Sequence, residues 1–352
     1  GISQEAMLER FFHAWENRLA SVTTDRVVRP FEWGVDWLPN KDDGRPPDQQ
    51  ISEWVSEVMQ DPTRFFDVPP TTNYQFSATD TSRSQYGEAG TLSFPTALPT
   101  PHAQNNVVTA RWFPATRHRE HSRAVLVLPQ WNSKAHGHIG LSRLLAKLGI
   151  SALRLSLPYH DDRMPSELTR ADYIVSSNVV RTVQVCRQAV LDARRAIAWL
   201  ADQGFERIGI LGTSLGSCLA LLTTAHEPLV KVQALNHVSP WFADVVWRGL
   251  STRHVRQGLQ SHIDLNMLRE MWQPISPWSY LDRVKNVRTL LVYGRYDLTF
   301  PVDLSEHLVK EFSRRDIPHE VAILPCGHYT TERFPFKHLD GYVLTKFLYQ
   351  NL

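Results

Sequence analysis

A short glycine-flanked turn between two apolar runs constrains this chain most. Residues 207–211 form an apolar run that is typical of a buried strand. The turn itself is Gly212-Thr213-Ser214-Leu215-Gly216, which has the pattern G-x-S-x-G, and an apolar run of helical length, 218–222, follows it. The order predicts a strand, a tight turn that presents Ser214, and a helix.

This order is that of a nucleophile elbow, in which a sharp turn holds a serine hydroxyl out of the sheet. A serine hydroxyl is a poor nucleophile unless a base contacts it. The flanking glycines have no Cβ, so strand and helix can approach closely. We expect the backbone N–H of Leu215, at the helix start, to point toward a developing oxyanion. The five-residue pattern is weak alone, and the strand and helix around it support the interpretation.

The second half of the chain alternates between buried strands and helices. Apolar or alternating runs cover 107–113, 124–128, 150–157, 232–238, 289–293 and 321–324. Helical patterns cover 141–148, 179–203, 302–314 and 336–350. This alternation predicts a mostly parallel sheet with helices on both faces. The functional crevice of such a sheet lies at the carboxyl ends of its strands.

From about residue 100 onward, the chain resembles the α/β-hydrolase superfamily in its esterase and lipase branches. The loop 158–165, which holds Pro158, Tyr159, Arg163 and Pro165, is similar to one in a poorly characterised group of α/β-hydrolase domain-containing proteins. The resemblance implies an α/β-hydrolase fold with a small helical lid at about 240–285. We expect a catalytic domain at 101–352 and a helical extension at 1–100.

The resemblance also implies where the acid and the base lie. Asp297 follows the strand ending at Tyr293, and His328 follows the last strand. His328 would take the proton of Ser214 while Asp297 holds its tautomer. Asp303 is a competing acid, but its place at a helix start is explained by capping.

The second oxyanion donor is expected in the loop after the strand 124–128. The glycine run found there in many lipases is absent, so we predict the backbone N–H of Gln130 or Trp131. His136 and His138 stand two apart without a carboxylate or thiolate neighbour, which is a weak metal pattern. We predict neither a metal nor a cofactor.

Four further residues are candidates for substrate binding: Arg163, His237, Trp241 and Trp272. Arg163 either binds a substrate carboxylate or pairs with Asp161 or Asp162 to shape its loop. The tryptophans of residues 240–285 either roof the pocket or fix the lid to the sheet. His237 follows a strand, but one strand too early for the base.

The first hundred residues hold no catalytic constellation. Two amphipathic helices are expected there, one over 3–21 and one from about Asp48, where Asp48 is a plausible cap. The extension packs on the sheet or roofs the active site, and the sequence leaves both open.

Composition excludes several other classes of protein. The net charge of +2 gives no reason to expect nucleic acid or an anionic membrane as partner. No apolar stretch reaches the about 18 residues needed for a membrane span. The first residues do not resemble a signal peptide, and Cys186, Cys218 and Cys326 are too few and scattered for a disulfide framework. These features favour a cytoplasmic protein of undetermined oligomeric state.

The sequence therefore predicts a serine hydrolase that cleaves a short or medium-chain carboxylic ester through an acyl-enzyme on Ser214. A serine peptidase or thioesterase would share the same elbow and triad. A non-catalytic binding protein that kept the fold would be expected to have a broken triad, and none of the three positions is broken here.

Overall fold

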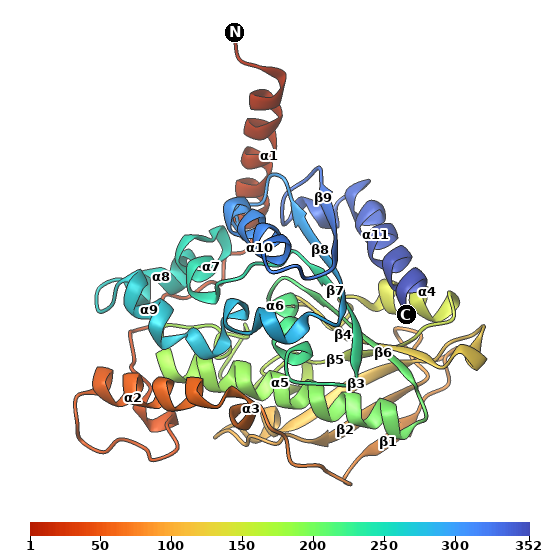
Figure 1. Ribbon diagram of the computed structural model, residues 1–352, viewed down its shortest axis with the longest axis horizontal. Helices are drawn as coiled ribbons and strands as arrows, with labels where there is room; N and C mark the ends of the chain where they lie inside the picture. The colour runs from red at the N-terminus through yellow and green to blue at the C-terminus, as the bar shows by residue number, and fades with distance from the viewer.

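A single nine-stranded sheet organises the protein, and a computed structural model describes all residues 1–352 (Figure 1). The strand order is β1-β2-β3-β5-β4-β6-β7-β8-β9. The strands are β1 (Gln75–Ala78), β2 (Gly90–Pro95), β3 (Val107–Phe113), β4 (Arg123–Leu128), β5 (Ser151–Leu155), β6 (Arg207–Thr213), β7 (Val230–Asn236), β8 (Arg288–Gly294) and β9 (His319–Leu324). Pairing is antiparallel from β1 to β3 and between β3 and β5, and parallel from β5 through β4 to β9.

Eleven α-helices surround this sheet. They are α1 (Gln4–Ser21), α2 (Pro47–Gln60), α3 (Pro62–Phe65), α4 (Ile139–Lys147), α5 (Val179–Asp202), α6 (Leu215–Thr224), α7 (Phe242–Arg248), α8 (Arg253–Leu259), α9 (Leu265–Met271), α10 (Val302–Arg314) and α11 (Phe336–Asn351). No helix is both long and apolar enough to cross a membrane. The predicted α/β-hydrolase fold is confirmed.

The sheet separates two apolar layers of the core, and β4 contributes to both because its side chains alternate between the two faces of the sheet. Ala124, Leu126 and Leu128 belong to the larger apolar cluster, with residues of α5 and α6. Val125 and Val127 belong to a smaller cluster with residues of α4 and α11. All six residues of β4 are buried, as expected for a strand covered on both faces.

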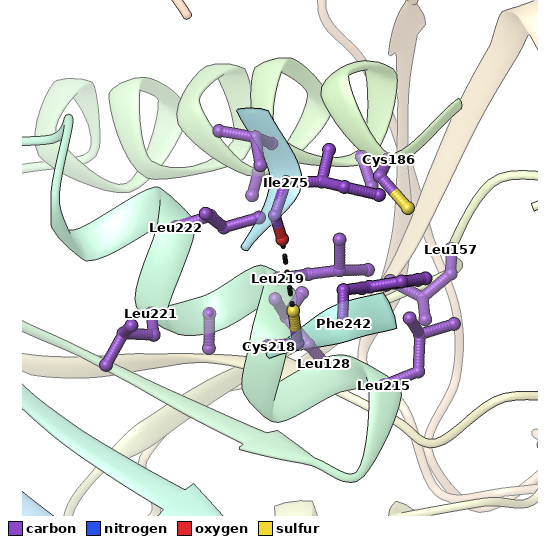
Figure 2. Packing of buried hydrophobic residues seen from close by; sticks show 14 of the residues in the cluster. Leu128, Leu157, Cys186, Leu215, Cys218, Leu219, Leu221, Leu222, Phe242 and Ile275 are labelled. Atoms are coloured by element: carbon purple, nitrogen blue, oxygen red, sulfur yellow. Dashed lines mark hydrogen bonds between the residues drawn. The ribbon is translucent and has the colours of Figure 1, made fainter. Parts of the chain in front are cut away.

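Helix α6 is packed from every side, which fixes the turn in front of it. Figure 2 shows Cys218 and Leu219 of α6 among Cys186 of α5, Phe242 of α7 and Ile275. The Cys218 thiol lies 3.7 Å from the carbonyl oxygen of Ile275. Cys186 and Cys218 are therefore small residues of the buried core.

The N-terminal hundred residues differ in detail from the sequence-based expectation. Strands β1 and β2 extend the sheet, so part of this region belongs to the central layer. Helix α2 begins at Pro47, with Pro46 at its N-cap, so the predicted cap at Asp48 is wrong. Asp48 lies inside the first turn, where its charge favours the helix dipole instead. The division of the chain at residue 100 stays a prediction.

Helix α1 reaches from the protein surface to the edge of the sheet. Its N-terminal end projects away from the body of the protein in Figure 1. Its C-terminal half is anchored, because Phe12 stacks on Tyr296 with ring centroids 4.6 Å apart. Glu16, further along the same helix, is fully buried. The first helix thus ends against the loops that follow β8 and β9.

Candidate active site

Ser214 lies in the turn between β6 and α6 with a left-handed backbone, φ 60° and ψ −120°. A non-glycine residue in such a conformation is strained and persists only where its surroundings hold it. Here its N–H donates to the carbonyl of Asn236 at 2.8 Å, and its own carbonyl accepts from the Ser217 hydroxyl at 2.6 Å. These bonds fix the turn to β7 and to the first turn of α6.

Both glycines of the motif are required by close backbone contacts. A Cβ on Gly212 would lie 2.1 Å from the carbonyl oxygen of Gly216. A Cβ on Gly216 would lie 2.3 Å from the carbonyl oxygen of Leu128 and 2.4 Å from that of Pro129. The start of α6 is therefore pressed against the end of β4, as the G-x-S-x-G pattern predicts.

Ser214, His328 and Asp297 form a continuous hydrogen-bonded relay. The Ser214 Oγ lies 2.8 Å from His328 Nε2, and His328 Nδ1 lies 2.8 Å from Asp297 Oδ2. The other carboxylate oxygen of Asp297 accepts from the backbone N–H groups of Thr299 and Phe300, each at 2.8 Å. The carboxylate is thereby held in one orientation, aimed at the imidazole.

The electrostatics of the relay favour a charged pair. Burial raises the pKa of Asp297, but the charge of His328, its hydrogen bond to the carboxylate and the neighbouring His237 imidazole hold it well below its usual range. Burial lowers the pKa of His328, but the charge of Asp297 and their hydrogen bond raise it above its ordinary value. The site is therefore suited to stabilise an imidazolium, which a proton-accepting histidine becomes during acyl transfer.

The competing acid lies elsewhere. Asp303 makes two hydrogen bonds with Arg248, at 2.7 and 2.8 Å, and its side chain is exposed. It lies in the first turn of α10, where Pro301 is the N-cap and no side chain caps the helix, so the predicted capping role of Asp303 is wrong.

The residues expected to donate their backbone N–H groups to an oxyanion line the same pocket. Gln130, Trp131 and Leu215 all line it with Ser214. Leu215 is the first residue of α6, so its N–H has no acceptor within the helix. The N–H groups of Gln130 and Trp131 make no hydrogen bond to another residue. Their role as oxyanion donors stays a prediction.

A histidine that the sequence analysis did not single out fixes this loop. His160 is buried, and its Nε2 accepts from the backbone N–H of Asn132 at 2.8 Å. Its Nδ1 donates to the carbonyl of Pro158 at 2.9 Å. Burial lowers the pKa of His160 to about 4, so it stays neutral and can accept the Asn132 proton. Asn132 has φ 60° and its Oδ1 accepts from the N–H of Ala171.

His237 lies beside the acid of the relay as well as in the pocket wall. Its side chain is 2% exposed, its Nδ1 lies 3.4 Å from Asp297 Oδ2, and its Nε2 lies 3.0 Å from the Thr331 hydroxyl. His237 lines the pocket, in line with its predicted place. Its contact with the acid was not predicted, because nothing in the sequence indicates that two histidines share one carboxylate.

Glu16 is a second residue that the sequence analysis missed. Its carboxylate accepts from the backbone N–H of Tyr329 at 2.9 Å and of Thr330 at 2.8 Å. Both N–H groups directly follow His328. The signal in the sequence was a carboxylate on the apolar face of an amphipathic helix, next to Phe12 and Trp15 in the helical pattern.

Two of the predicted substrate-binding residues lie outside the pocket. Arg163 is fully buried and its guanidinium lies 2.9 Å from Asp192, with further bonds to the carbonyls of Asn105 and Ser156. It is therefore a structural residue, and its partner is neither Asp161 nor Asp162. The prediction was wrong because Asp192, on α5, is distant in sequence.

Trp272 is likewise a packing residue. It is fully buried, and its indole N–H donates to the carbonyl of Val179 at 3.1 Å. It attaches the helical insertion between β7 and β8 to α5, so its predicted contact with substrate is wrong. Trp241, in contrast, lines the pocket and stacks on His307 with centroids 4.9 Å apart.

The pocket has a cavity volume of about 1430 Å³. Its walls come from the elbow, from the loop after β4, from the insertion after β7 and from the segment 22–26 that follows α1. The N-terminal region thus contributes to the pocket. The volume exceeds the about 300–1,000 Å³ common for small-molecule sites.

Two groups of side chains have metal-ligand character. The ligand atoms of His237, Asp297 and His328 lie within 4.8 Å of one another. Both nitrogens of His328 and one oxygen of Asp297 already make the hydrogen bonds described above, so this set fits a proton relay better than a metal site. The exposed group His118, Glu120 and His121 lies outside the pocket. His138 is bonded to the Thr213 hydroxyl at 2.7 Å.

Comparison with solved structures places this architecture among the α/β hydrolases. The protein is similar to an acetyl xylan esterase from Paenibacillus sp., with a TM-score of 0.59 and 15% identity over 95% of this chain and 99% of that one. A second acetyl xylan esterase, from Thermoanaerobacterium sp., has a TM-score of 0.57 and 14% identity over 86% of this chain and 98% of that one.

An acylaminoacyl peptidase from Pyrococcus horikoshii is also similar, with a TM-score of 0.53 and 14% identity over 74% of this chain. The match spans 41% of that longer peptidase. At these identities the likeness shows the fold alone. No curated protein matches the chain.

The family model described as alpha/beta hydrolase domain containing 18 matches residues 48–286. The matched range includes Ser214 and the loop after β4, and it ends before Asp297 and His328. Since it covers more than half of the chain, the protein belongs to the alpha/beta hydrolase domain containing 18 family.

Proposed function

We propose that the protein is a serine hydrolase that cleaves a carboxylic ester through an acyl-enzyme on Ser214. The observation that carries this proposal is the unbroken relay from Ser214 Oγ through His328 to Asp297, with both hydrogen bonds at 2.8 Å. Each member follows the carboxyl end of its own parallel strand, and the relay opens into the large pocket. An intact relay also argues against a binding protein that only kept the fold.

Acylation begins when His328 Nε2 accepts the Ser214 proton as Oγ attacks the substrate carbonyl. The oxyanion that forms accepts from the N–H of Leu215 and from that of Gln130 or Trp131. His328 then passes its proton to the departing alcohol. Asp297 stabilises the imidazolium throughout and itself remains deprotonated.

Deacylation repeats these steps with water in place of the serine. His328 takes a proton from the water as it attacks the acyl carbonyl, and returns it to Ser214 Oγ as the acyl group leaves. Besides the substrate and this water, the steps use only residues of the chain. The fold is shared with solved esterases and with peptidases, so a thioester or a peptide is the alternative substrate of the same relay.

Two measurements test the proposal. A fluorophosphonate probe should label Ser214 and should not label Ser214→Ala, whose melting temperature should match that of the wild type. A panel of aryl esters, thioesters and anilides with the same acyl groups, from acetyl to decanoyl, then separates the three substrate classes. Ester turnover above that of the anilide supports the proposal, and labelling of Ser214→Ala would contradict it. A cytoplasmic location stays a prediction.

A further inference from the structure

Arg170 brings a guanidinium into the pocket that no hydrogen bond within the protein satisfies. Its side chain is only 11% exposed, and its Nε is buried without a hydrogen-bond partner. The nearest carboxylates, Asp25 and Asp172, lie 3.5 and 3.9 Å away. Burial lowers the pKa of Arg170, and the charges of Asp25 and Asp172 oppose this shift only in part. A guanidinium has five N–H donors, and buried donors of a native protein are normally paired.

Arg26 adds a second positive charge at the same place. It lines the same pocket, donates to the Tyr329 hydroxyl at 2.9 Å and to the carbonyl of Ala20 at 2.8 Å, and has an unpartnered buried Nε. No carboxylate forms an ion pair with it. Burial, together with the charges of Arg170 and Arg26, lowers the pKa of His254 to about 4. Both guanidinium groups therefore act on one neutral imidazole, whose Nδ1 also has no partner.

These charges are not neutralised by the acidic residues nearby. Asp172 is held by Arg29 at 3.0 Å. Asp25 is 55% exposed, so water screens its charge. The net charge around Arg26 and Arg170 is therefore positive, and an acidic ligand would balance it.

The pair of arginines is connected to the two loops of the candidate relay. Arg170 lies over the ring of Trp131, 5.6 Å from its centroid, and Trp131 stacks on His254 with centroids 5.9 Å apart. Arg26 bonds to Tyr329, the residue after His328. A group bound between the arginines thus lies on the wall between the oxyanion loop and the base.

We propose that Arg170, with Arg26 beside it, binds an acidic group of the substrate, a carboxylate or a phosphate. This inference rests on the ester hydrolase function proposed for Ser214. Arg170 supplies the free donors, Trp131 orients its plane, and the dehydrated surroundings strengthen the attraction. The protein is then selective for esters with an acidic group away from the scissile bond.

The test compares matched esters in wild type and Arg170→Gln. The substrates are the nitrophenyl half-ester of glutaric acid, the neutral nitrophenyl ester of valeric acid with the same chain length, and a nitrophenyl ester whose acyl chain ends in a phosphate. Loss of a charged hydrogen bond should raise KM for the acidic esters by about 10- to 100-fold. The neutral ester should change by less than about twofold, since it has no charged group for the guanidinium to bind. The larger KM effect identifies which acid the site takes.

Asp25→Asn is the matched control. Asp25 could compete with an acidic ligand for Arg170, and unlike Asp172 it forms no ion pair with a second arginine. The substitution should leave KM for the acidic esters unchanged or lower it. If Arg170 only braces the segment 22–26 through Asp25, both variants should slow all esters equally and lower the melting temperature. That result, or a wild type that does not prefer the acidic esters, overturns the proposal.

Direct binding separates this proposal from the hydrolase function. Calorimetry on Ser214→Ala with glutarate and with inorganic phosphate measures the site without turnover. Binding that disappears in Ser214→Ala/Arg170→Gln supports the acidic site even if no ester is cleaved. Ester cleavage together with no binding and no Arg170 effect removes the acidic site and leaves the hydrolase function standing.

Discussion

The carboxylate of Glu16 accepts from the backbone N–H of Thr330 at 2.8 Å, which ties the first helix to the loop that carries His328. The two residues are separated by most of the chain. A Cβ on Gly327 would lie 2.4 Å from the Glu16 carboxyl carbon, so the loop fits closely around this side chain. We infer that α1 is a structural part of the base loop as well as a surface extension.

Glu16→Gln should therefore lower both stability and turnover. The amide retains one acceptor, but its NH₂ group faces a backbone N–H of Tyr329 or Thr330 and leaves that donor unpaired. The cost of an unpaired buried donor is about 1–3 kcal/mol. Urea unfolding and kcat on a neutral ester measure the two effects. Glu9→Gln, on the exposed face of the same helix, is the control and should change neither. Equal stability and kcat for Glu16→Gln and wild type would exclude the inferred role.

The relay itself could be predicted from the sequence for a simple physical reason. Parallel strands end at one edge, so residues just after β6, β8 and β9 are brought together by topology alone. Ser214 follows β6 directly, and Asp297 and His328 follow the ends of β8 (Gly294) and β9 (Leu324) by a few residues. Residues that reach the site from irregular segments, such as Arg26 and His160, carry no comparable signal.

Removing the acid tests the assignment against its competitor. Asp297→Asn should lower kcat by about 10⁴-fold, because the amide favours the wrong histidine tautomer. Asp303→Asn removes an exposed pair with Arg248 and should stay within about 0.5 kcal/mol of wild type in stability, with unchanged kcat. Steady-state kinetics of the two variants at one pH decides between them. Loss of turnover in Asp303→Asn alone would transfer the acid role to that residue.

The pH dependence of the reaction should report His328. The base must be neutral to accept the Ser214 proton, so kcat/KM should fall as pH decreases through the pKa of His328. That pKa is raised above its ordinary value of 6.5, chiefly by Asp297 against the effect of burial. In Asp297→Asn the negative charge that raises the pKa of His328 is gone. The acid limb of the pH–rate profile of the residual activity should therefore move to lower pH. A pH–rate profile with the same limb in both proteins would contradict the coupling.

The same shifts have opposite consequences for stability. Because the pKa of His328 is raised in the folded protein, this residue stabilises the fold at pH values below its unfolded-state pKa. The contribution is lost as the pH rises through the folded-state pKa. Because the pKa of Asp297 is lowered in the folded protein, this residue stabilises the fold at pH values above its unfolded-state pKa. That contribution is lost as the pH falls through the folded-state pKa. Melting temperatures of wild type and Asp297→Asn should therefore converge in acid.

Side-chain direction explains why Arg163 and Trp272 were misplaced. Arg163 follows a strand end, where a residue can face the pocket or turn back beneath the loop. Which occurs depends on Asp192, a buried carboxylate on α5 that only the folded chain brings near. Several tryptophans follow β7 and look alike in the sequence. The sequence therefore could not distinguish Trp241, which lines the pocket, from Trp272, which packs on α5.

Gly216 offers the sharpest test of the elbow. Its substitution by alanine places a Cβ 2.3 Å from the carbonyl oxygen of Leu128, and backbone atoms of a buried strand end cannot move aside. The start of α6 must then shift, which should cost about 1–3 kcal/mol or more and displace both Ser214 and the N–H of Leu215. Gly140 is the matched control, because a Cβ there meets nothing within 4 Å and the residue lies in α4, also on the pocket. Gly140→Ala should gain up to about 1 kcal/mol from helix propensity and keep full turnover. Urea unfolding and fluorophosphonate labelling rates of the two variants measure the difference, and normal labelling of Gly216→Ala would mean that the contact with β4 does not hold the nucleophile.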